Sequence, residues 1–572
     1  MKNKLKVTIF KSEKFVFLII LILGIFFRTV GFNWDQKQHL HPDERFLTMT
    51  VGAIQIPDSF KNYLNPQKSS LNPYNHDYNF FVYGAFPINI VRLIAEENNL
   101  IGYNQIHFIG RFLTVISDVF IIFLLYLTAK NILNSKLALL SIFFYSISIL
   151  PIQLSHFYTV DPFLNFFIFL SFYLLTQIFE KKNKPYSTII FLSISFSLAL
   201  ASKISAVYFL PIIFLAFLFI FFKDKKKLLF SSLLFILLTP IAFRFFQPQF
   251  FSSGDFLNWQ VNPQFISNLK ELQSYNQNKY YPPGIQWLQT TPIIFPLKNI
   301  LFWGLGLPFS FFFIVSLFYL PFFLKKEGIA KNFFISLSFF YLTYLLVIQG
   351  LQQVTTMRYF LPLYPFISLI TGFVTYQLYF KKLKLYRHTI LNIFLLIILL
   401  IYPFSFISIY LKDHSRITAS KWIYQNIPYQ STLAVEYWDD PLPLTINPNF
   451  PNFYNYETLN VASPDTQNKI FQLKKQLKNT DYIILSSNRF YIPIPQYPDL
   501  FPFTSKYYKY LFDGSLGFKK INEFTSYPSL KIFNKTIFTI NDTGAEEAFT
   551  VYDHPKVIIF QKTENFNSSI LE

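Results

Sequence analysis

The sequence predicts an α-helical polytopic membrane protein with about 11 transmembrane helices and a C-terminal α/β domain. Of the 572 residues, 52% are hydrophobic, and the mean hydropathy is +0.33, which is too apolar for an ordinary soluble protein. Apolar runs long enough to cross a bilayer follow one another up to residue 411. After residue 412 the apolar runs are short and are interrupted by turn residues, as in a small domain of strands and helices.

The apolar runs divide the chain into a transmembrane domain, residues 1–411, and a C-terminal domain, residues 412–572. The first run follows Lys11 and Lys14 but lacks a small-residue cleavage site, so we expect an uncleaved anchor. Two loops, 31–110 and 247–296, are too long to be simple connections. The expected spans are 15–30, 112–129, 137–152, 161–179, 187–201, 205–222, 228–246, 297–323, 332–349, 359–380 and 388–411.

Basic residues indicate the orientation of these spans. Lysines and arginines gather at the N-terminus and at alternate connections, and cytoplasmic loops are the ones that collect such residues. We therefore expect a cytoplasmic N-terminus and an extracytoplasmic C-terminal domain in the plasma membrane. The net charge of +19 then faces anionic lipid headgroups, not nucleic acid. The basic connections are 130–136, 181–184, 223–227, 325–331 and 381–387.

The long outer loops contain no further span in this interpretation. Phe80–Ile94 is apolar, but Gly84 and Pro87 interrupt it and Glu96 follows it. It is predicted to be a helix lying at the membrane interface, because a twelfth span would invert every later connection against the lysine pattern.

Several classes of chemistry have no residues to support them. The chain contains no cysteine, which excludes disulfides, thiolate metal sites and cysteine nucleophiles. It also lacks a P-loop, a Rossmann glycine fingerprint and a Gly-x-Ser-x-Gly elbow, so nucleotide binding and serine hydrolysis have no recognisable motif.

The polar segment Gln38–Phe46 follows the first span directly and contains the adjacent acids Asp43 and Glu44. Carboxylates beside a bilayer are costly and often functional. They can act as a general base or as metal ligands, and we expect the low dielectric nearby to raise the pKa of a carboxyl toward the working range. The alternative is a helix start after Pro42 with a solvated charge.

Four basic residues fall at the predicted outer ends of spans, where the positive-inside rule disfavours them. Such residues pair with an acid or with an anionic ligand. For Arg111 the alternative is Asp118, two turns further along the same helix. A phosphate-bearing lipid at the outer leaflet would otherwise account for them. The four residues are Arg111, Lys203, Arg244 and Arg358.

Gln153–Asp161 connects the third and fourth predicted spans and is richer in polar residues than a tight turn requires. His156 and Asp161 are candidate substrate contacts. The alternatives are a hydrogen-bonded interfacial histidine and a helix N-cap.

A divalent metal ion is an open alternative. A site of nitrogen and oxygen ligands is compatible with the residue types present, although the zinc-binding spacing HExxH is absent. The residues concerned are His39, His41, Asp43, Glu44 and His156.

Several motifs together resemble a known superfamily. They are His41-Pro42-Asp43-Glu44, Gly110-Arg111, Ser155–Asp161, Ala199–Ser205, Arg358–Pro365 and Ala545–Pro555. With an acidic pair in the first outer loop, they resemble the GT-C membrane glycosyltransferases. The nearest likeness is to family 39, which includes protein mannosyltransferases and the aminoarabinose transferases acting on lipid A. His41–Glu44 is also similar to the HPDE signature of mannosyltransferases that build glycosylphosphatidylinositol anchors, and the ending is similar to uncharacterised bacterial relatives.

The resemblance implies an enzyme, a hexosyl- or pentosyltransferase that moves a sugar from a polyprenyl-phosphate donor to an acceptor hydroxyl at the outer face. Asp43 would be the general base of an inverting-type transfer, with Glu44 as its acidic neighbour. The donor phosphate would bind Arg111, Lys203 and Arg358, and His41, His156 and Asp161 would contact substrate. The acceptor is a lipid, a glycan or a protein, and the tail shows no β-trefoil-type repeat that would favour a protein.

Two other functions fit the same composition. A transporter or flippase of lipid-linked sugars would require broken helices and charges near the bilayer midplane, and Asp118 is the only acid in the middle of a predicted span. A non-catalytic membrane scaffold would leave the cations at the outer edge without a role.

Overall fold

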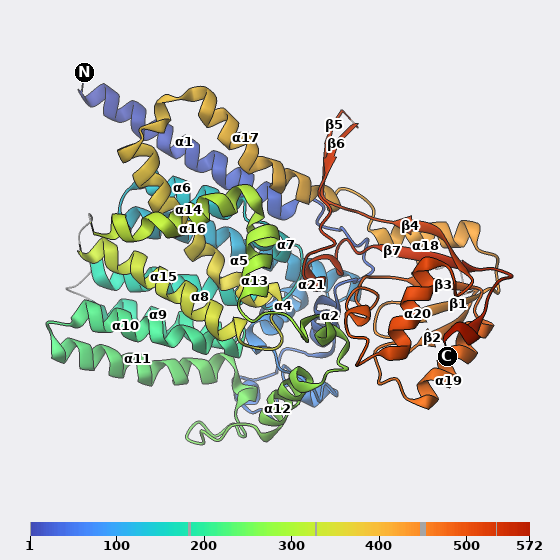
Figure 1. The fold of residues 1–572 in the computed structure, drawn as a ribbon. Coiled ribbons are helices and arrows are strands. Elements are labelled where there is room, and N and C mark those ends of the chain that lie inside the picture. The colour runs from blue at the N-terminus through green and yellow to red at the C-terminus, as the bar shows by residue number, and fades with distance from the viewer. Residues whose placement is uncertain (1, 181–184, 326–328, 447–452, 534, 572) are drawn as a thin grey trace.

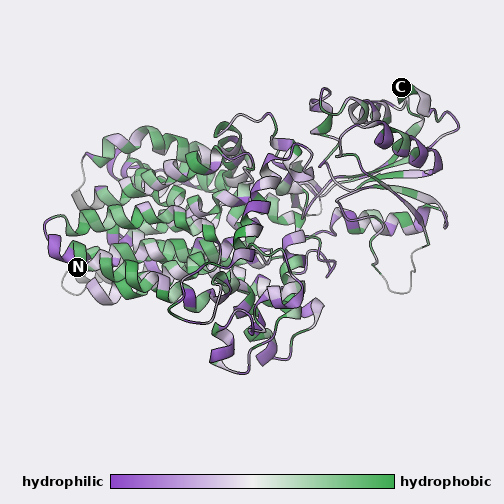
Figure 2. Cartoon of the chain, turned by 90° about the horizontal axis from the view of Figure 1, so that it is seen from below, coloured by the Kyte–Doolittle hydropathy of each residue, from purple (hydrophilic) through white to green (hydrophobic). Residues whose placement is uncertain are grey.

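The chain folds into a bundle of long helices with a smaller α/β part at one end (Figure 1). The computed structural model describes residues 2–180, 185–325, 329–446, 453–533 and 535–571. The predicted basic connections at 181–184 and 326–328, and the side chains of residues 2–12, lie outside this description. Figure 2 shows that the long helices are mostly hydrophobic, whereas the α/β part mixes hydrophobic and hydrophilic segments. We call the end of the bundle that carries the α/β part the outer end.

The bundle helices lie side by side along one common direction. Within the described residues, eight helices are long and apolar enough to cross a membrane, or nine if a bent pair counts as one span. The chain is therefore a multi-pass membrane protein, but the predicted number of eleven spans is not confirmed. The bundle helices are α1 (Lys2–Thr29), α5 (Tyr103–Ile132), α6 (Ser135–Ser146), α7 (Ile149–Ser155), α8 (Asp161–Glu180), α9 (Pro185–Leu200), α10 (Leu210–Phe221), α11 (Lys225–Phe246), α14 (Leu307–Leu324), α15 (Ile329–Gly350), α16 (Tyr364–Tyr376) and α17 (Thr389–Phe406).

The predicted span 137–152 is the bent pair, since α6 and α7 meet at 61°. Pro151 lacks an N–H group, and its ring would clash with the carbonyl four residues earlier in a continuous helix, which breaks the helix near Ile147. The hydroxyl of Ser148 donates to the carbonyl of Phe144 at 2.9 Å and satisfies one of the freed groups. The bend brings the segment that ends at His156 against the end of α1.

The two long loops form short helices at the outer end, namely α2 (Pro42–Ala53), α3 (Phe60–Leu64), α4 (Ala85–Glu97), α12 (Pro263–Gln277) and α13 (Ile294–Asn299). The helix predicted over 80–94 is α4, which starts at Ala85 and packs on α2 and α5. Gly84 is needed before it, because a Cβ there would collide with the backbone of Ala201. The N–H of Phe86 donates to the carbonyl of Ala201 at 3.0 Å, so this contact fixes the turn that carries Lys203. The location of α4 at the membrane interface stays a prediction.

Residues 412–572 contain a five-stranded sheet in the order β2-β1-β3-β7-β4. β1 pairs in parallel with β2 and β3, and β7 runs antiparallel to β3 and β4. A separate antiparallel hairpin consists of β5 and β6. The elements are α18 (Ser415–Asn426), β1 (Thr432–Glu436), β2 (Asn455–Leu459), α19 (Gln467–Asn479), β3 (Tyr482–Leu485), α20 (Pro502–Asp513), β4 (Phe518–Phe524), β5 (Ser529–Ile532), β6 (Lys535–Thr539), α21 (Glu547–Thr550) and β7 (Val557–Lys562).

The central strands are buried on both faces, as their continuous apolar sequences require. Successive side chains of a strand point to opposite faces. Ile483 therefore joins the core beneath α19 and α20, whereas Ile484 joins the core that contains α18. That second core continues into the helix bundle. The α/β part is thus packed onto the outer end through a shared apolar interior.

A buried charged cluster also fastens this junction. The imidazole of His554 lies between the carboxylates of Asp553 and Asp542, at 2.5 and 2.9 Å. Asp553 in turn accepts hydrogen bonds from the hydroxyl of Tyr410 at 2.8 Å and from Gln153 at 3.0 Å, both in the bundle. Burial alone would lower the pKa of His554, but the two carboxylates raise it to about 10.

This cluster predicts a pH-dependent stability. Because the pKa of His554 is raised from 6.5 to about 10, its contribution is fully present below pH 6.5 and is lost as the pH rises toward 10. We expect the difference in thermal midpoint between the wild type and His554→Gln to be largest at pH 6 and to shrink by pH 10. A difference that stays constant over this range would show that protonation of His554 does not contribute.

Candidate active site

Asp43 and Glu44 open helix α2, and their side chains point to different places. Pro42 occupies the first helical position, and the N-cap His41 accepts a hydrogen bond from the N–H of Glu44 at 3.4 Å on Nδ1. Consecutive residues of a helix project about 100° apart. Asp43 therefore faces a cavity, whereas Glu44 faces the protein interior.

Asp43 forms an ion pair with Arg358, 315 residues later in the chain. Their side chains are 19% and 22% exposed, so both remain reachable from the cavity. Burial alone would raise the pKa of Asp43, but Arg358 and His41 bring it below its ordinary value. The carboxyl group is thus ionised at neutral pH.

Glu44 is engaged inside the protein. Its two oxygens accept hydrogen bonds from Arg111 at 2.5 and 2.8 Å, and one also accepts from the N–H of Tyr158 at 2.8 Å. Arg111 also contacts Asp35 at 2.9 Å, and the side chains of all three charged residues are completely buried. Arg111 therefore holds α2 against α5 and does not pair with Asp118. The latter contacts Arg28 and the hydroxyl of Tyr145 instead.

The structure brings Lys203 close to Arg358. The ammonium group of Lys203 lies 2.8 Å from a carboxylate oxygen of Asp161 and 4.3 Å from the centre of the Tyr359 ring. The guanidinium of Arg358 lies 5.7 Å from the centre of the same ring. Both cations thus lie at one corner of the site. Arg244, in contrast, donates to three carbonyl groups of the 253–258 turn.

The two histidines predicted to contact substrate are buried in structural positions. The ring nitrogens of His156 lie 2.8 and 2.9 Å from the carbonyl oxygens of Ile152 and Val30, and its ring stacks on Tyr410. His41 caps α2 and packs between Phe157 and Tyr552, and burial lowers its pKa to about 4. In this arrangement both histidines support the backbone around the site.

The residues proposed as metal ligands point to different partners. His39 lies 3.1 Å from the amide oxygen of Asn104, while His41, Glu44 and His156 make the contacts described above. In the part of the chain that the structure describes, no group of three or more His, Asp or Glu side chains is arranged to hold a metal ion. Dependence on a divalent metal stays a prediction.

The cavity beside Asp43 has a volume of about 580 Å³, which is in the range of ligand-binding sites. Its walls come from the bundle, the second outer loop and the α/β part together. Helix α2 of the first outer loop supplies Asp43, the outer end of the bundle supplies Arg358, and the second outer loop supplies Tyr281 and Trp287. The residues from the α/β part are Tyr437, Trp438, Asp439, Arg489, Glu547, Ala548 and Tyr552.

The aromatic segment after β1 is held in an unusual conformation. Trp438 has a φ of 103°, which a residue with a large side chain rarely adopts. Its ring is 44% exposed and lies 5.6 Å from the ring of Tyr281, centre to centre. Strained backbone of this kind occurs where the surrounding structure enforces it, often at binding sites.

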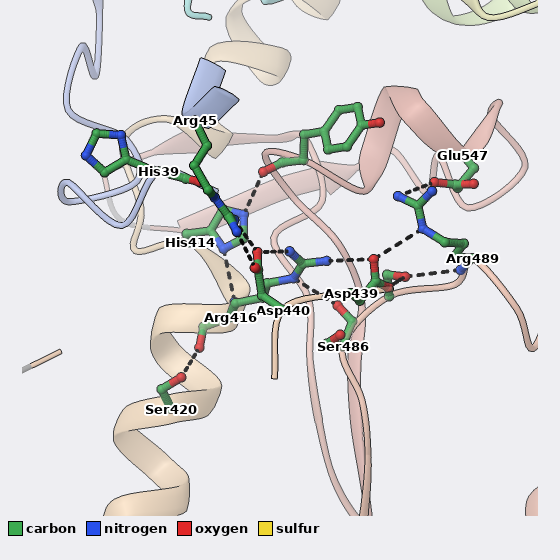
Figure 3. Close-up of polar contacts among 12 residues, drawn as sticks. His39, Arg45, His414, Arg416, Ser420, Asp439, Asp440, Ser486, Arg489 and Glu547 are labelled. Carbon is green, nitrogen blue, oxygen red and sulfur yellow. Dashed lines mark hydrogen bonds and ion pairs between the residues drawn. The ribbon is translucent and has the colours of Figure 1, made fainter. Parts of the chain in front are cut away.

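A row of alternating charges directly follows Trp438 in the chain and links this segment to α2 (Figure 3). Arg45, two residues after Asp43, donates two hydrogen bonds of 2.8 Å to Asp440. Arg416 lies between Asp440 and Asp439, at 3.4 and 3.8 Å. Arg489 then forms ion pairs with Asp439 and Glu547, with nitrogen–oxygen distances of 3.2 and 2.8 Å. The helix that carries Asp43 is thus tied directly to the opposite wall of the cavity.

Sequence reasoning did not select the residues of this opposite wall as site residues. The sequence did contain a signal for Glu547 and Tyr552, because both lie in Ala545–Pro555, one of the motifs that carry the family resemblance. A further signal was the run Tyr437–Asp440, in which two aromatic residues and two acids directly follow β1. Neither pattern indicates a site until the α/β part is folded against the bundle.

The fold can be compared with known proteins. Residues 97–249 match the family model described as dolichyl-phosphate-mannose-protein mannosyltransferase. No curated protein matches the sequence. The apo structure of the oligosaccharyltransferase of Archaeoglobus fulgidus aligns over 96% of this chain and 88% of its own, with 13% identity and a TM-score of 0.51. The chain has the GT-C fold.

Two further solved structures with the GT-C fold are similar. The same archaeal enzyme, AglB, in complex with an inhibitory peptide and a dolichol-phosphate aligns over the same shares of both chains, with 12% identity and a TM-score of 0.51. ArnT from Cupriavidus metallidurans bound to undecaprenyl phosphate aligns over 91% of this chain and 97% of its own, with 9% identity and a TM-score of 0.41. The fold implied by the motif resemblance is confirmed by the match to the archaeal oligosaccharyltransferase.

Proposed function

We propose that this protein is a membrane glycosyltransferase that moves a sugar from a polyprenyl-phosphate-linked donor to an acceptor hydroxyl at the outer face of the membrane. The observation that carries this proposal is the Asp43–Arg358 pair in the wall of a cavity built jointly by the bundle and the α/β part. Such a transfer requires a carboxylate that takes the acceptor proton and a cation that binds the donor phosphate, and both groups line this cavity.

Asp43 is the proposed general base. Its carboxylate takes the proton of the acceptor hydroxyl while the acceptor oxygen forms a bond to the anomeric carbon of the sugar. The bond between that carbon and the phosphate oxygen breaks, and its electron pair leaves with the polyprenyl phosphate. Attack from the side opposite the phosphate inverts the anomeric centre.

Arg358 is the proposed partner of the donor phosphate, with Lys203 as a second positive charge. Arginine offers a planar set of N–H donors that binds phosphate through two hydrogen bonds, and the phosphate gains negative charge as the sugar leaves. A phosphate that binds Arg358 competes with Asp43 for the same guanidinium. Donor binding would therefore release the Asp43 carboxylate and raise its pKa, which makes it a stronger base.

Arg111 and Glu44 have a supporting role in this proposal. Their complete burial leaves no surface for a phosphate or an acceptor. They hold the start of α2 so that Asp43 faces the cavity. The acceptor would approach from the opposite wall, where Trp438 and Tyr437 present exposed rings.

The comparisons support a lipid-linked donor. The AglB structure with the same fold contains a dolichol-phosphate and a peptide, and the matching family model is named for a dolichyl-phosphate-mannose-dependent enzyme. The lysine pattern supports a cytoplasmic N-terminus and, with it, a cavity on the extracytoplasmic side.

The experiment that tests this function supplies the purified protein, in nanodiscs, with radiolabelled polyprenyl-phosphate sugars and cell-envelope acceptors. We expect the label to move from the lipid to an acceptor and free polyprenyl phosphate to form in equal amount. Movement of the intact lipid-linked sugar between leaflets without release of polyprenyl phosphate would favour a flippase instead.

Arg358→Gln tests the phosphate contact. Hydrogen bonds to charged groups contribute about 1.5–3 kcal/mol, so we expect binding of undecaprenyl phosphate to weaken about 10- to 100-fold. Binding is measured by titration of the protein in detergent. Arg387→Gln, at an exposed position near the other end of the bundle, is the matched control and should leave the affinity unchanged. Equal affinities of the two variants for undecaprenyl phosphate would show that Arg358 does not bind the phosphate.

A further inference from the structure

The β5–β6 hairpin is separate from the five-stranded sheet and projects sideways beyond the outline of the molecule (Figure 1). Its strands pair Leu530 with Phe538 and Ile532 with Lys535. An isolated two-stranded hairpin is marginally stable in water, so it needs a supporting surface.

Part of that surface is the outer end of α17. β5 packs against α17, whose candidate membrane span runs from Thr389 to Ile409. The N–H of Ser529 donates to the hydroxyl of Ser408 at 3.0 Å, and Lys412 donates to the hydroxyl of Ser529 at 2.7 Å. The base of the hairpin is therefore fixed at the depth where the span leaves the membrane.

The free end of the hairpin presents apolar and basic side chains. Phe533 is 100% exposed, and Ile532 and Ile537 are about half exposed. Lys531 and Lys535 are exposed beside them. Apolar side chains flanked by lysines are typical of segments that lie in the boundary between lipid headgroups and acyl chains.

The neighbourhood favours lipid as the partner. Only 33% of the apolar window of α17 is buried inside the protein, so most of this helix faces the bilayer. Leu411, just beyond the span, is 67% exposed next to the base of the hairpin. The hairpin extends across the helix direction, along the plane in which the surrounding lipids would lie.

We propose that the β5–β6 hairpin is a membrane anchor of the α/β part. Phe533, Ile532 and Ile537 enter the outer-leaflet boundary, and Lys531 and Lys535 contact the phosphate groups of anionic lipids. Because β4 of the main sheet leads into β5 through a short connection, this anchor fixes the edge of the sheet relative to the bilayer. The anchor is independent of the proposed glycosyl transfer.

The test uses the absence of cysteine from the chain. Phe533→Cys in the full-length protein is spin-labelled and placed in nanodiscs that contain phosphatidylcholine and phosphatidylglycerol. Phe471→Cys, an exposed position on α19, is the matched control. Collision of the label with oxygen, which concentrates in lipid, is compared with collision with a water-soluble nickel chelate.

We expect the ratio of oxygen to nickel collisions to be several-fold higher at position 533 than at position 471. Adding Lys531→Glu and Lys535→Glu should lower the ratio at position 533 when phosphatidylglycerol is present, and less in phosphatidylcholine alone. Equal ratios at the two positions would overturn the proposal. Shielding of position 533 from both probes would also overturn it, because that result indicates a protein partner.

Discussion

Asp43→Asn should lower the rate of sugar transfer about 100- to 10,000-fold, the usual contribution of a general base. Asparagine has nearly the same shape as aspartate but cannot take the acceptor proton. The loss should appear in kcat, measured as release of polyprenyl phosphate in the nanodisc assay. Binding of undecaprenyl phosphate should be retained or tightened, because the phosphate no longer competes with a carboxylate for Arg358.

One control variant and one pH measurement accompany this experiment. Asp58→Asn changes an exposed carboxylate in the same outer loop and should transfer at the wild-type rate. In the wild type, the fall of kcat/KM at acid pH should set in only below the ordinary titration range of an aspartate, because Arg358 and His41 hold the pKa of Asp43 below its usual value in the free protein. Wild-type turnover by Asp43→Asn would show that the base lies elsewhere.

Arg111→Met should destabilise the protein by about 3–5 kcal/mol, the typical effect of removing one partner from a buried ion pair. Glu44 and Asp35 would be left without a positive charge in a completely buried site. The measurement is the thermal midpoint in detergent, followed by the loss of monodisperse protein on size exclusion.

Lys130→Met is the matched control, because Lys130 is exposed on the same helix α5. The double variant Arg111→Met/Glu44→Gln should regain part of the lost stability, since one uncompensated charge is removed. Equal thermal midpoints of Arg111→Met and Lys130→Met would show that the buried cluster does not hold α2 in place.

Much of the fold could be predicted from hydropathy and patterning. The long helices coincide with predicted spans, and β1, β3 and β7 coincide with the apolar runs seen after residue 412. The span count was less predictable because hydropathy does not report geometry. A proline at position 151 turns one predicted span into two helices, and the run at 187–201 forms a helix of only 16 residues.

The candidate site was predictable only in part. The sequence singled out Asp43 and Arg358, but it contained no sign that side chains 315 residues apart would form a pair. It grouped Asp43 with Glu44 because they are adjacent, although the helix directs them to different surroundings. For Arg111 the helix spacing suggested Asp118, but that acid is taken by Arg28, and Glu44 approaches from another helix. The opposite wall, with Trp438 and Arg489, depends on docking between the bundle and the α/β part.

The most direct test of the central claim is an experimental structure of the protein with undecaprenyl phosphate bound. We expect the phosphate to lie in the cavity against Arg358, with Lys203 nearby, and the Asp43 carboxylate to be released toward the space in front of Trp438. A phosphate bound elsewhere on the protein, with the Asp43–Arg358 pair still intact, would contradict the account.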